Sequence, residues 1–472
     1  MYDYDLIVLG VGPAGEKGAA QAAYFGKRVL VIEREKEPGG AAVHTGTLPS
    51  KTLRETAIFL SGYRQRELFG LSVEVNRDSA VPKLLSRKNA VRELEVQRIK
   101  WNLERHDVTT LHGVGRFVDA HTLEVTTLGA APRRVTGEVI LIATGSVPYQ
   151  PPFIPFDDPD VDDSDTILLL DRLPASMTVL GGGVIGCEYA AMFAAMQVKV
   201  TLVEPRPKLL PFLDLEMGER LRAAMSSLGV EFRLGATPKA VSRTAGGIAC
   251  TLDDGSTIIS EKLLAASGRT GRSTELGLET VGVSVDKRGY IKVDENYKTE
   301  LPHVYAAGDV IGFPALASTS MEQARVAISH AFGFDYKRQV SQVIPFGIYT
   351  IPEVSCVGLS EEAAKVQGVD AVVGRAFYRD NARGKIIGDK DGVIKLVFDR
   401  ATRKLVGCHC IGDRASELVH IGQAVLMLGG TVETFIEMVF NYPTLAELYK
   451  YAAYDALGKM TPPATRNPTS PP

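Results

Sequence analysis

The feature that most constrains the fold is an internal repeat. Residues 6–33 read LIVLGVGPAGEKGAAQAAYFGKRVLVIE, and residues 178–204 read TVLGGGVIGCEYAAMFAAMQVKVTLVE. Each copy has a short apolar run, a glycine-rich turn, an alanine-rich helical stretch and a β-branched run that ends in glutamate. The first glycine and the glutamate are 23 residues apart in both copies. The repeat predicts two copies of one supersecondary unit.

Each copy has the strand, turn, helix and strand pattern of a dinucleotide-binding unit. The first glycine makes the tight turn, the second lets the backbone approach a pyrophosphate, and the third lets helix and strand pack closely. The helix N-terminus offers N–H groups to the anion, and the glutamate can bond ribose hydroxyls. In the two copies these residues are Gly10, Gly12, Gly15 and Glu33, and Gly181, Gly183, Gly186 and Glu204. We therefore expect two dinucleotide sites, the alternative being one site and a decayed duplicate.

Other segments predict the rest of the architecture. Buried runs at 138–144, 262–266 and 304–307 each reach a glycine turn, and ligands of such sheets gather at carboxyl strand ends. Beyond Val343 the pattern changes to a hairpin-like pair and then helical segments, which predicts a separate α+β domain. The pair is 392–398 with 404–411, and the helical segments are 416–428 and 444–457. The proline-rich tail 459–472 is expected to be disordered.

Composition excludes several classes of partner. There are 53 basic and 56 acidic residues, with a net charge of −3 and no long block of either sign. This balance argues against nucleic acid and anionic lipid and favours small molecules. No apolar run approaches the ~18 to 20 residues of a membrane span, and the first residues lack a secretory signal.

The five cysteines are odd in number and show no paired metal-site spacing, which suits a reducing cytoplasm. Cys408-His409-Cys410 lies within an alternating strand pattern, so we expect strand packing there and no metal.

The two units resemble the flavoprotein disulfide reductase family, as do the segment 39–51, the run 305–309 (YAAGD) and the element 442–444 (YPT). The resemblance covers nearly the whole chain. Members of that family pass hydride from a nicotinamide through FAD to a cysteine pair. The resemblance implies an α/β fold with two Rossmann-like domains and a C-terminal α+β dimerisation domain, and hence a homodimer. It divides the chain into an FAD-binding domain (1–150 with 271–342), an NAD(P)-binding domain (151–270) and an interface domain (343–458).

The family's redox loop, G-G-x-C-x-x-x-x-C-x-P-S-K, reads GGAAVHTGTLPSK here, with Ala42 and Thr47 at the cysteine positions. A threonine hydroxyl is far too weak an acid to replace a thiol of pKa ~8.5, so we expect no dithiol chemistry. Tyr442 and Glu447 occupy the positions of the family's acid–base histidine and its orienting glutamate. Tyrosine, with a reference pKa of ~10, is a poor proton shuttle at neutral pH.

The residues that the family uses beside the flavin are still present. The resemblance implies that Lys51 lies beside flavin N5 and pairs with Glu188, the alternative being an exposed surface lysine. We expect Pro49 to be the first helical residue, which puts Lys51 near the positive end of a helix dipole, an unfavourable place. His44 is the only histidine of this loop and is either functional or a bystander. The resemblance also implies that Asp309 bonds the ribityl chain of FAD and that Ala317 gives a backbone contact. The further cofactor-binding residues expected are Gly40, Gly115, Thr144, Gly145, Arg206 and Gly268.

Within the family, the chain resembles soluble pyridine nucleotide transhydrogenases at His44 and at residues 46–47, 49–51 and 440–444. Those enzymes move hydride between NADPH and NAD through FAD. Ala42 departs from that pattern, and the stretch 40–43 is closer to quinone or dye reductases, the second interpretation. A catalytically silent flavin-binding or redox-sensing protein is a third. Glu204 favours a 2′-hydroxyl over a 2′-phosphate, although Arg206 or Lys208 can offset it. NAD(H) is therefore the safer expectation, and NADP(H) stays open.

Overall fold

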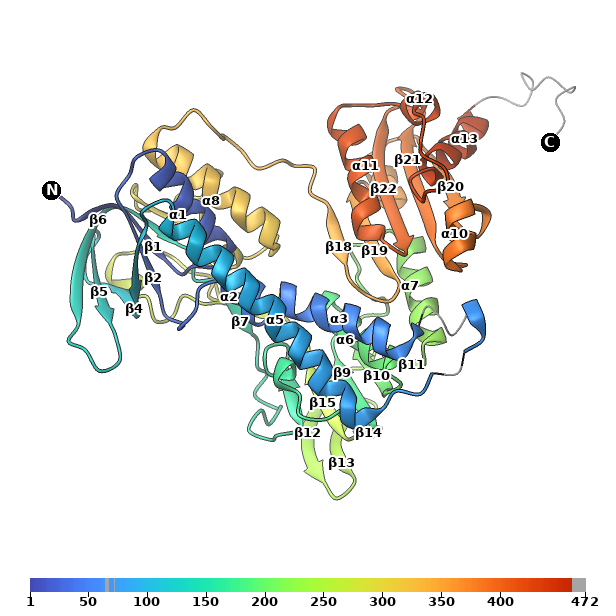
Figure 1. The fold of residues 1–472 in the computed structure, drawn as a ribbon, viewed down its shortest axis with the longest axis horizontal. Helices are drawn as coiled ribbons and strands as arrows, with labels where there is room; N and C mark the ends of the chain where they lie inside the picture. The colour runs from blue at the N-terminus through green and yellow to red at the C-terminus, as the bar shows by residue number, and fades with distance from the viewer. Residues whose placement is uncertain (64–67, 72, 461–472) are drawn as a thin grey trace, which may run out of the picture.

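The computed structural model describes residues 1–63, 68–71 and 73–460. Figure 1 shows two sheets of Rossmann type and a C-terminal antiparallel sheet, each covered by helices. This arrangement confirms the predicted fold class. No helix among the described residues has the length and apolar character needed to cross a membrane.

The first sheet contains the first repeat. Its strands are β1 (Tyr4–Leu9), β2 (Val29–Glu33), β3 (Thr109–His112), β4 (Val114–Phe117), β5 (Thr122–Thr126), β6 (Arg133–Ile142) and β17 (Val304–Ala306). The order is β3-β2-β1-β6-β5-β4, and β17 pairs with β6. The strands β1, β2, β3, β6 and β17 run parallel, whereas β4 and β5 form an antiparallel extension. Helices α1 (Pro13–Tyr24), α5 (Arg77–Glu104) and α8 (Ala317–Phe332) share one hydrophobic cluster with this sheet.

The second sheet contains the second repeat and is parallel throughout, in the order β11-β10-β9-β15-β8. Its strands are β8 (Val161–Asp163), β9 (Ser176–Leu180), β10 (Lys199–Glu204), β11 (Val230–Leu234) and β15 (Lys262–Ala265). Helices α6 (Val184–Ala195) and α7 (Leu215–Ser227) belong to it, as does the three-stranded sheet of β12 (Pro238–Thr244), β13 (Gly247–Leu252) and β14 (Thr257–Ser260). A ribbon of β7 (Ser146–Pro148) and β16 (Arg269–Gly271) connects the two parts, and α5 runs from one to the other (Figure 1).

The third sheet is antiparallel, in the order β18-β19-β22-β21-β20. Its strands are β18 (Phe346–Ile348), β19 (Glu353–Gly358), β20 (Ala371–Phe377), β21 (Val393–Asp399) and β22 (Leu405–Gly412). The helices are α9 (Glu361–Val366), α10 (Ala382–Ile387), α11 (Ala415–Met427), α12 (Val432–Glu437) and α13 (Leu448–Met460). Short 3-10 turns lie at Thr166–Leu169, Leu278–Thr280, Asp309–Ile311 and Tyr378–Asp380. Cys408 and Cys410 are buried in β22, as expected for strand packing.

Helix boundaries differ from the prediction, most clearly at the end of α13 and the start of α3. Helix α13 continues to Met460, so Lys459 is helical rather than part of the tail, and its ammonium donates to the Val373 carbonyl at 2.9 Å. Residues 461–472 lie outside the described residues. Helix α3 (Thr47–Ser61) begins two residues before Pro49. Proline is accepted there because the first-turn N–H groups of a helix have no partner within the helix.

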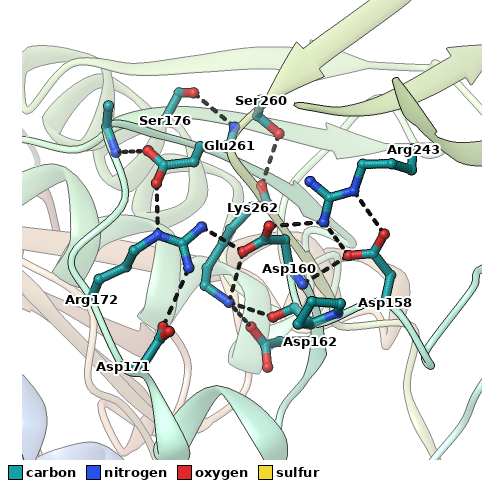
Figure 2. A network of polar contacts seen from close by, with 12 residues as sticks. Asp158, Asp160, Asp162, Asp171, Arg172, Ser176, Arg243, Ser260, Glu261 and Lys262 are labelled. Carbon is teal, nitrogen blue, oxygen red and sulfur yellow. Dashed lines mark hydrogen bonds and ion pairs between the residues drawn. The ribbon is translucent and has the colours of Figure 1, made fainter. Parts of the chain in front are cut away.

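A network of charged side chains secures the second part (Figure 2). The Asp160 carboxylate accepts from Arg172 at 2.6 Å and from Arg243 of β12 at 2.8 Å. Lys262 of β15, 3% exposed, lies 3.2 Å from the Asp162 carboxylate. Burial alone would raise the pKa of Asp160, but Arg243 and Arg172 bring it down to about 2. The network therefore connects the three-stranded sheet to the parallel sheet.

A second network joins the second part to the C-terminal domain. The Lys395 ammonium of β21, 1% exposed, lies 2.9 Å from Asp214 and 2.8 Å from Glu361. Asp214 is fully buried and also caps α7 by accepting from the Glu216 N–H. Burial alone would lower the pKa of Lys395, but Glu361 and Asp214 raise it above its ordinary value. The two domains thus share one buried cation.

Candidate functional site

One large cavity, of about 1190 Å³, lies at the carboxyl ends of the first parallel strands and reaches the second and third parts. Many of the residues expected at a cofactor or catalytic site line it. They are Gly10, Gly12, Glu33, Gly40, His44, Thr47, Lys51, Gly115, Thr144, Gly145, Glu188, Asp309 and Ala317. The other expected residues lie outside this wall: Gly15, Gly181, Gly183, Gly186, Glu204, Arg206, Gly268, Tyr442 and Glu447.

The first glycine turn requires glycine for two separate reasons. Gly10 has φ +91°, and a Cβ there would lie 2.6 Å from the Ala143 carbonyl oxygen. A Cβ on Gly15 would lie 1.9 Å from the Gly10 carbonyl oxygen, so close packing of α1 on β1 excludes any side chain. Gly12 differs, because its Cβ would meet only the Gly40 Cα at 3.8 Å. The backbone at Gly12 is therefore open to the cavity.

The lining groups fit an FAD molecule. Gly12 is the N-cap residue of α1, and no side chain accepts from the first N–H groups of the helix there. These groups are therefore free for a pyrophosphate. The Glu33 carboxylate accepts from the Val11 N–H at 2.7 Å and the Glu35 N–H at 2.9 Å, and it keeps acceptor capacity for ribose hydroxyls. Asp309 accepts from the Ser146 hydroxyl at 3.2 Å, and Ala317 begins α8 without a side-chain cap.

Three neighbouring residues have mainly structural contacts. A Cβ on Gly115 would lie 2.6 Å from a Leu9 methyl group, so packing under the cavity explains this glycine. The Thr144 hydroxyl donates to the Arg272 carbonyl at 2.6 Å. Gly145 has φ +73° and open space where a Cβ would lie.

Lys51 and Glu188 form an ion pair in the cavity wall. The Lys51 ammonium lies 2.7 Å from Glu188 Oε2, and the Lys51 side chain is 26% exposed. Lys51 comes from the first turns of α3 and Glu188 from α6. The carboxylate therefore offsets the unfavourable position of a cation near a helix N-terminus. The pair is the contact implied by the family resemblance.

Among the described residues, those that line the cavity beside this pair contain no sulfur. Ala42 and Thr47 line the cavity, on α2 (Gly40–His44) and at the start of α3. The His44 Nε2 is 3.0 Å from the Pro38 carbonyl, a contact within its own loop.

All five cysteines of the chain lie elsewhere and are buried: Cys187, Cys250, Cys356, Cys408 and Cys410. Burial raises the pKa of Cys250 to about 11 and that of Cys356 to about 12, so these thiols stay protonated at neutral pH. No group of three or more metal-ligating side chains occurs among the described residues.

The second repeat reproduces the geometry of the first. Gly181 has φ +113°, and a Cβ there would lie 2.5 Å from the Ala266 carbonyl oxygen. A Cβ on Gly186 would lie 1.9 Å from the Gly181 carbonyl oxygen. Gly183 caps α6 with open space beside it, as Gly12 caps α1, and Gly268 has φ +101° with open space. The second copy thus retains an uncapped helix N-terminus that suits a pyrophosphate.

The glutamate of the second repeat has a partner that the first lacks. Glu204 accepts from the Gly182 N–H at 2.6 Å and from the Arg206 guanidinium at 2.7 Å. Burial alone would raise the pKa of Glu204, but Arg206 and nearby backbone N–H groups lower it. The carboxylate is therefore charged, and Arg206 neutralises it.

Tyr442 and Glu447 are not brought to the cavity of their own chain. Tyr442 is 73% exposed in the segment before α13, and Glu447 is the residue that precedes this helix. The Asn381 amide lies 3.5 Å from the Glu447 carboxylate.

Sequence reasoning missed Tyr349, Arg269 and Arg272, which also line the cavity. No local pattern marks them, because they lie directly after a short strand or in a ribbon between domains.

Comparison with known proteins agrees with this geometry. A profile of the pyridine nucleotide-disulphide oxidoreductase family matches residues 4–331, and the profile of its dimerisation domain matches residues 344–453. A soluble pyridine nucleotide transhydrogenase from Mycobacterium tuberculosis (strain ATCC 25177 / H37Ra) is 46% identical over 461 residues, 98% of each chain. One from Marinomonas sp. (strain MWYL1) is 41% identical over 460 residues, 97% of this chain and 99% of that protein.

Solved structures show the same fold. The HOCl-induced flavoprotein disulfide reductase from Escherichia coli matches with a TM-score of 0.86 and 27% identity, over 96% of this chain and 99% of that one. LpdA from Mycobacterium tuberculosis matches with a TM-score of 0.87 and 27% identity, over 95% and 98%. The chain therefore belongs to the pyridine nucleotide-disulphide oxidoreductase family.

Proposed function

We propose that the protein is a soluble pyridine nucleotide transhydrogenase that moves hydride equivalents between NADPH and NAD with FAD and without a cysteine relay. As a family member it is an FAD-dependent oxidoreductase of pyridine nucleotides. Its similarity to relatives named as transhydrogenases extends over almost the full length of both chains, which supports this activity over others in the family.

The observation that carries the proposal is the Lys51–Glu188 pair beside a cavity wall without sulfur. The ammonium lies 2.7 Å from the carboxylate, and Ala42 and Thr47 line the same cavity. A disulfide requires two sulfur atoms at ~2 Å, and a methyl group and a hydroxyl cannot form it. The electron acceptor is therefore a small molecule that enters the site. The similarity to relatives named as transhydrogenases supports a second nucleotide as this acceptor.

Each group of the site has a task in this scheme. Bound FAD supplies the ring system that accepts and returns the hydride equivalent. Gly12 and the first N–H groups of α1 would hold its pyrophosphate, Glu33 its ribose and Asp309 its ribityl chain. Lys51 keeps a positive charge in the cavity wall, and Glu188 holds that charge in place. The uncapped N-terminus of α6 would bind the pyrophosphate of each nucleotide in turn.

Anaerobic rapid mixing tests the proposal. NADPH or NADH should bleach the flavin absorbance, and a thionicotinamide analogue of NAD should restore it faster than a benzoquinone does. Treatment with a thiol-alkylating reagent should leave turnover unchanged, because all five cysteines are buried away from the cavity. Faster reoxidation by the quinone would favour a quinone reductase, and failure of both nucleotides to bleach the flavin would favour a flavin-binding protein without this activity.

We also propose that the protein acts as a homodimer in the cytoplasm. The dimerisation-domain match and the exposure of Tyr442 outside its own chain's cavity support the dimer. Five unpaired, buried cysteines support a reducing compartment.

A further inference from the structure

Tyr349 contacts the Lys51–Glu188 pair from a third part of the molecule. The Lys51 ammonium lies 4.9 Å from the centroid of the Tyr349 ring. The Tyr349 backbone N–H donates to Glu188 Oε1 at 2.9 Å, while Glu188 Oε2 accepts from Lys51 at 2.7 Å. Lys51 belongs to α3, Glu188 to α6 and Tyr349 to the segment after β18. Three domains thus meet at one ammonium group.

We propose that Tyr349 is a positioning residue that holds the Lys51 ammonium against Glu188, through the face of its ring and through its backbone N–H. What Lys51 contributes to hydride transfer rests on the proposed function, but the positioning itself does not. The negative face of an aromatic ring attracts a cation within about 6 Å of its centroid. The four-carbon stem of lysine is flexible, so a single carboxylate contact leaves the ammonium free to turn towards solvent.

The carboxylate depends on Tyr349 as well. Each Glu188 oxygen has its own donor, one from the Lys51 ammonium and the other from the Tyr349 N–H. This arrangement fixes the plane of the carboxylate and hence the point at which the ammonium rests. The other polar neighbour of the ammonium, the Ser50 hydroxyl, is 3.4 Å away, too far for a strong hydrogen bond.

The Tyr349 ring is itself held in place. It packs against the preceding strand β18, so that a Cβ added to Gly347 would lie 3.5 Å from its Cε2 atom. Burial raises the pKa of the Tyr349 hydroxyl, with Ser416 opposing this effect, so the hydroxyl is neutral at neutral pH. The cation therefore contacts the ring face and not a phenolate oxygen. A phenylalanine at this position should make the same contact.

The reactivity of the Lys51 amine tests the inference without reference to turnover. Protein with and without FAD is treated with an acetylating N-hydroxysuccinimide ester, and acetylation of Lys51 is followed by mass spectrometry. Tyr349→Leu should raise the Lys51 acetylation rate by about fivefold, and Tyr349→Phe should stay within about twofold of the parent. Tyr24→Leu, at a residue 75% exposed at the end of α1, is the matched control.

A second readout separates positioning from general damage. Tyr349→Leu should lower the kcat for flavin reduction and the midpoint potential of bound FAD, while the KM for the nucleotide stays within about twofold. Tyr349→Phe should restore both values. If Tyr349→Leu does not fold, Tyr349→Met, which fills a similar volume without a ring, takes its place.

Unchanged Lys51 acetylation in the leucine variant would overturn the inference, as would an equal change in the phenylalanine variant. Failure of nucleotide-to-nucleotide transfer would overturn the proposed function but would leave the acetylation result intact. The two conclusions are therefore tested separately.

Discussion

Glu33 and Glu204 end corresponding strands of the two repeats, yet their carboxylates have different partners. Within the described part of the chain, Glu33 accepts only from backbone N–H groups, whereas Glu204 also pairs with the Arg206 guanidinium at 2.7 Å. The position two residues beyond the glutamate is Glu35 in the first repeat and Arg206 in the second. Because Arg206 neutralises Glu204 and is half exposed, we propose that the second site accommodates a 2′-phosphate that a lone carboxylate would repel.

We therefore expect Arg206→Gln to raise the KM for NADPH by about tenfold and to leave the KM for NADH within about twofold. The variant leaves the Glu204 carboxylate charged and without a cation beside it, so that it repels a phosphate but still accepts from a hydroxyl. Steady-state kinetics with both coenzymes measure the effect. Lys199→Gln, at a residue largely exposed at the opposite end of β10, is the control, and equal rises for both coenzymes would contradict the argument.

Lys51 is the only cation whose ammonium contacts Glu188 in the described part of the chain. Lys51→Met should slow flavin reduction by NADPH by about 100-fold, because a preorganised charge is lost from the cavity wall. The FAD content should not change, since the groups that hold the cofactor lie elsewhere. Rapid mixing and the flavin-to-protein absorbance ratio check both expectations, with Lys83→Met on the exposed side of α5 as control. A normal reduction rate would remove Lys51 from the mechanism.

Among secondary-structure elements, β21 and α7 are joined by the buried pair of Lys395 and Asp214. Lys395→Met should lower the free energy of unfolding by about 3 kcal/mol, because it leaves the buried Asp214 carboxylate without its cation. Denaturant unfolding followed by fluorescence measures the loss. Lys404→Met, at an exposed position before β22, should change stability by less than about 0.5 kcal/mol.

The ends of β8, β12 and β15 are connected through Asp160, whose pKa falls from 3.8 to about 2. A carboxylate with a depressed pKa in the folded state stabilises the fold above its unfolded-state pKa, and this contribution disappears as the pH falls through about 2. Asp160→Asn should therefore lower the Tm by a constant amount between pH 5 and pH 7. The corresponding loss in the free energy of unfolding is about 1 to 3 kcal/mol. The gap between parent and variant should narrow below about pH 4.

Thermal unfolding over this pH range tests the prediction. Asp171→Asn is the control, since the Asp171 side chain is 71% exposed at the edge of the same network. A gap that widens at low pH would contradict the assignment.

For the whole molecule, we propose that the exposed Tyr442 completes a site on the partner subunit. Light scattering should give twice the mass of the chain. Tyr442→Ala should slow transfer to the acceptor nucleotide by about tenfold and leave flavin reduction within about twofold, because Lys51 and Glu188 remain in place. Rapid mixing separates the two half-reactions, with Tyr454→Ala on α13 as control. Equal losses in both would place Tyr442 outside the acceptor step.

The sequence by itself determined the two repeats, the fold class and the conformation of each glycine turn. These features are local. The positive φ at Gly10 and the close helix packing at Gly15 each require glycine at that position, so the sequence itself shows them. The sequence does not set the first residue of α3, since a proline can occupy more than one position in the first turn of a helix.

Apart from the Lys51–Glu188 pair, which the family resemblance implied, only the tertiary structure decided which distant side chains meet. The contacts of the Tyr349 ring with Lys51 and of Lys395 with Asp214 form because the domains pack together. The spacing of these residues along the sequence does not predict them. The pairing of Arg206 with Glu204 is local, but the sequence left Arg206 and Lys208 as alternatives, and the path of the chain after β10 selects Arg206. Backbone conformation is set by neighbouring residues, whereas the contacts of long, flexible side chains are set by the whole fold.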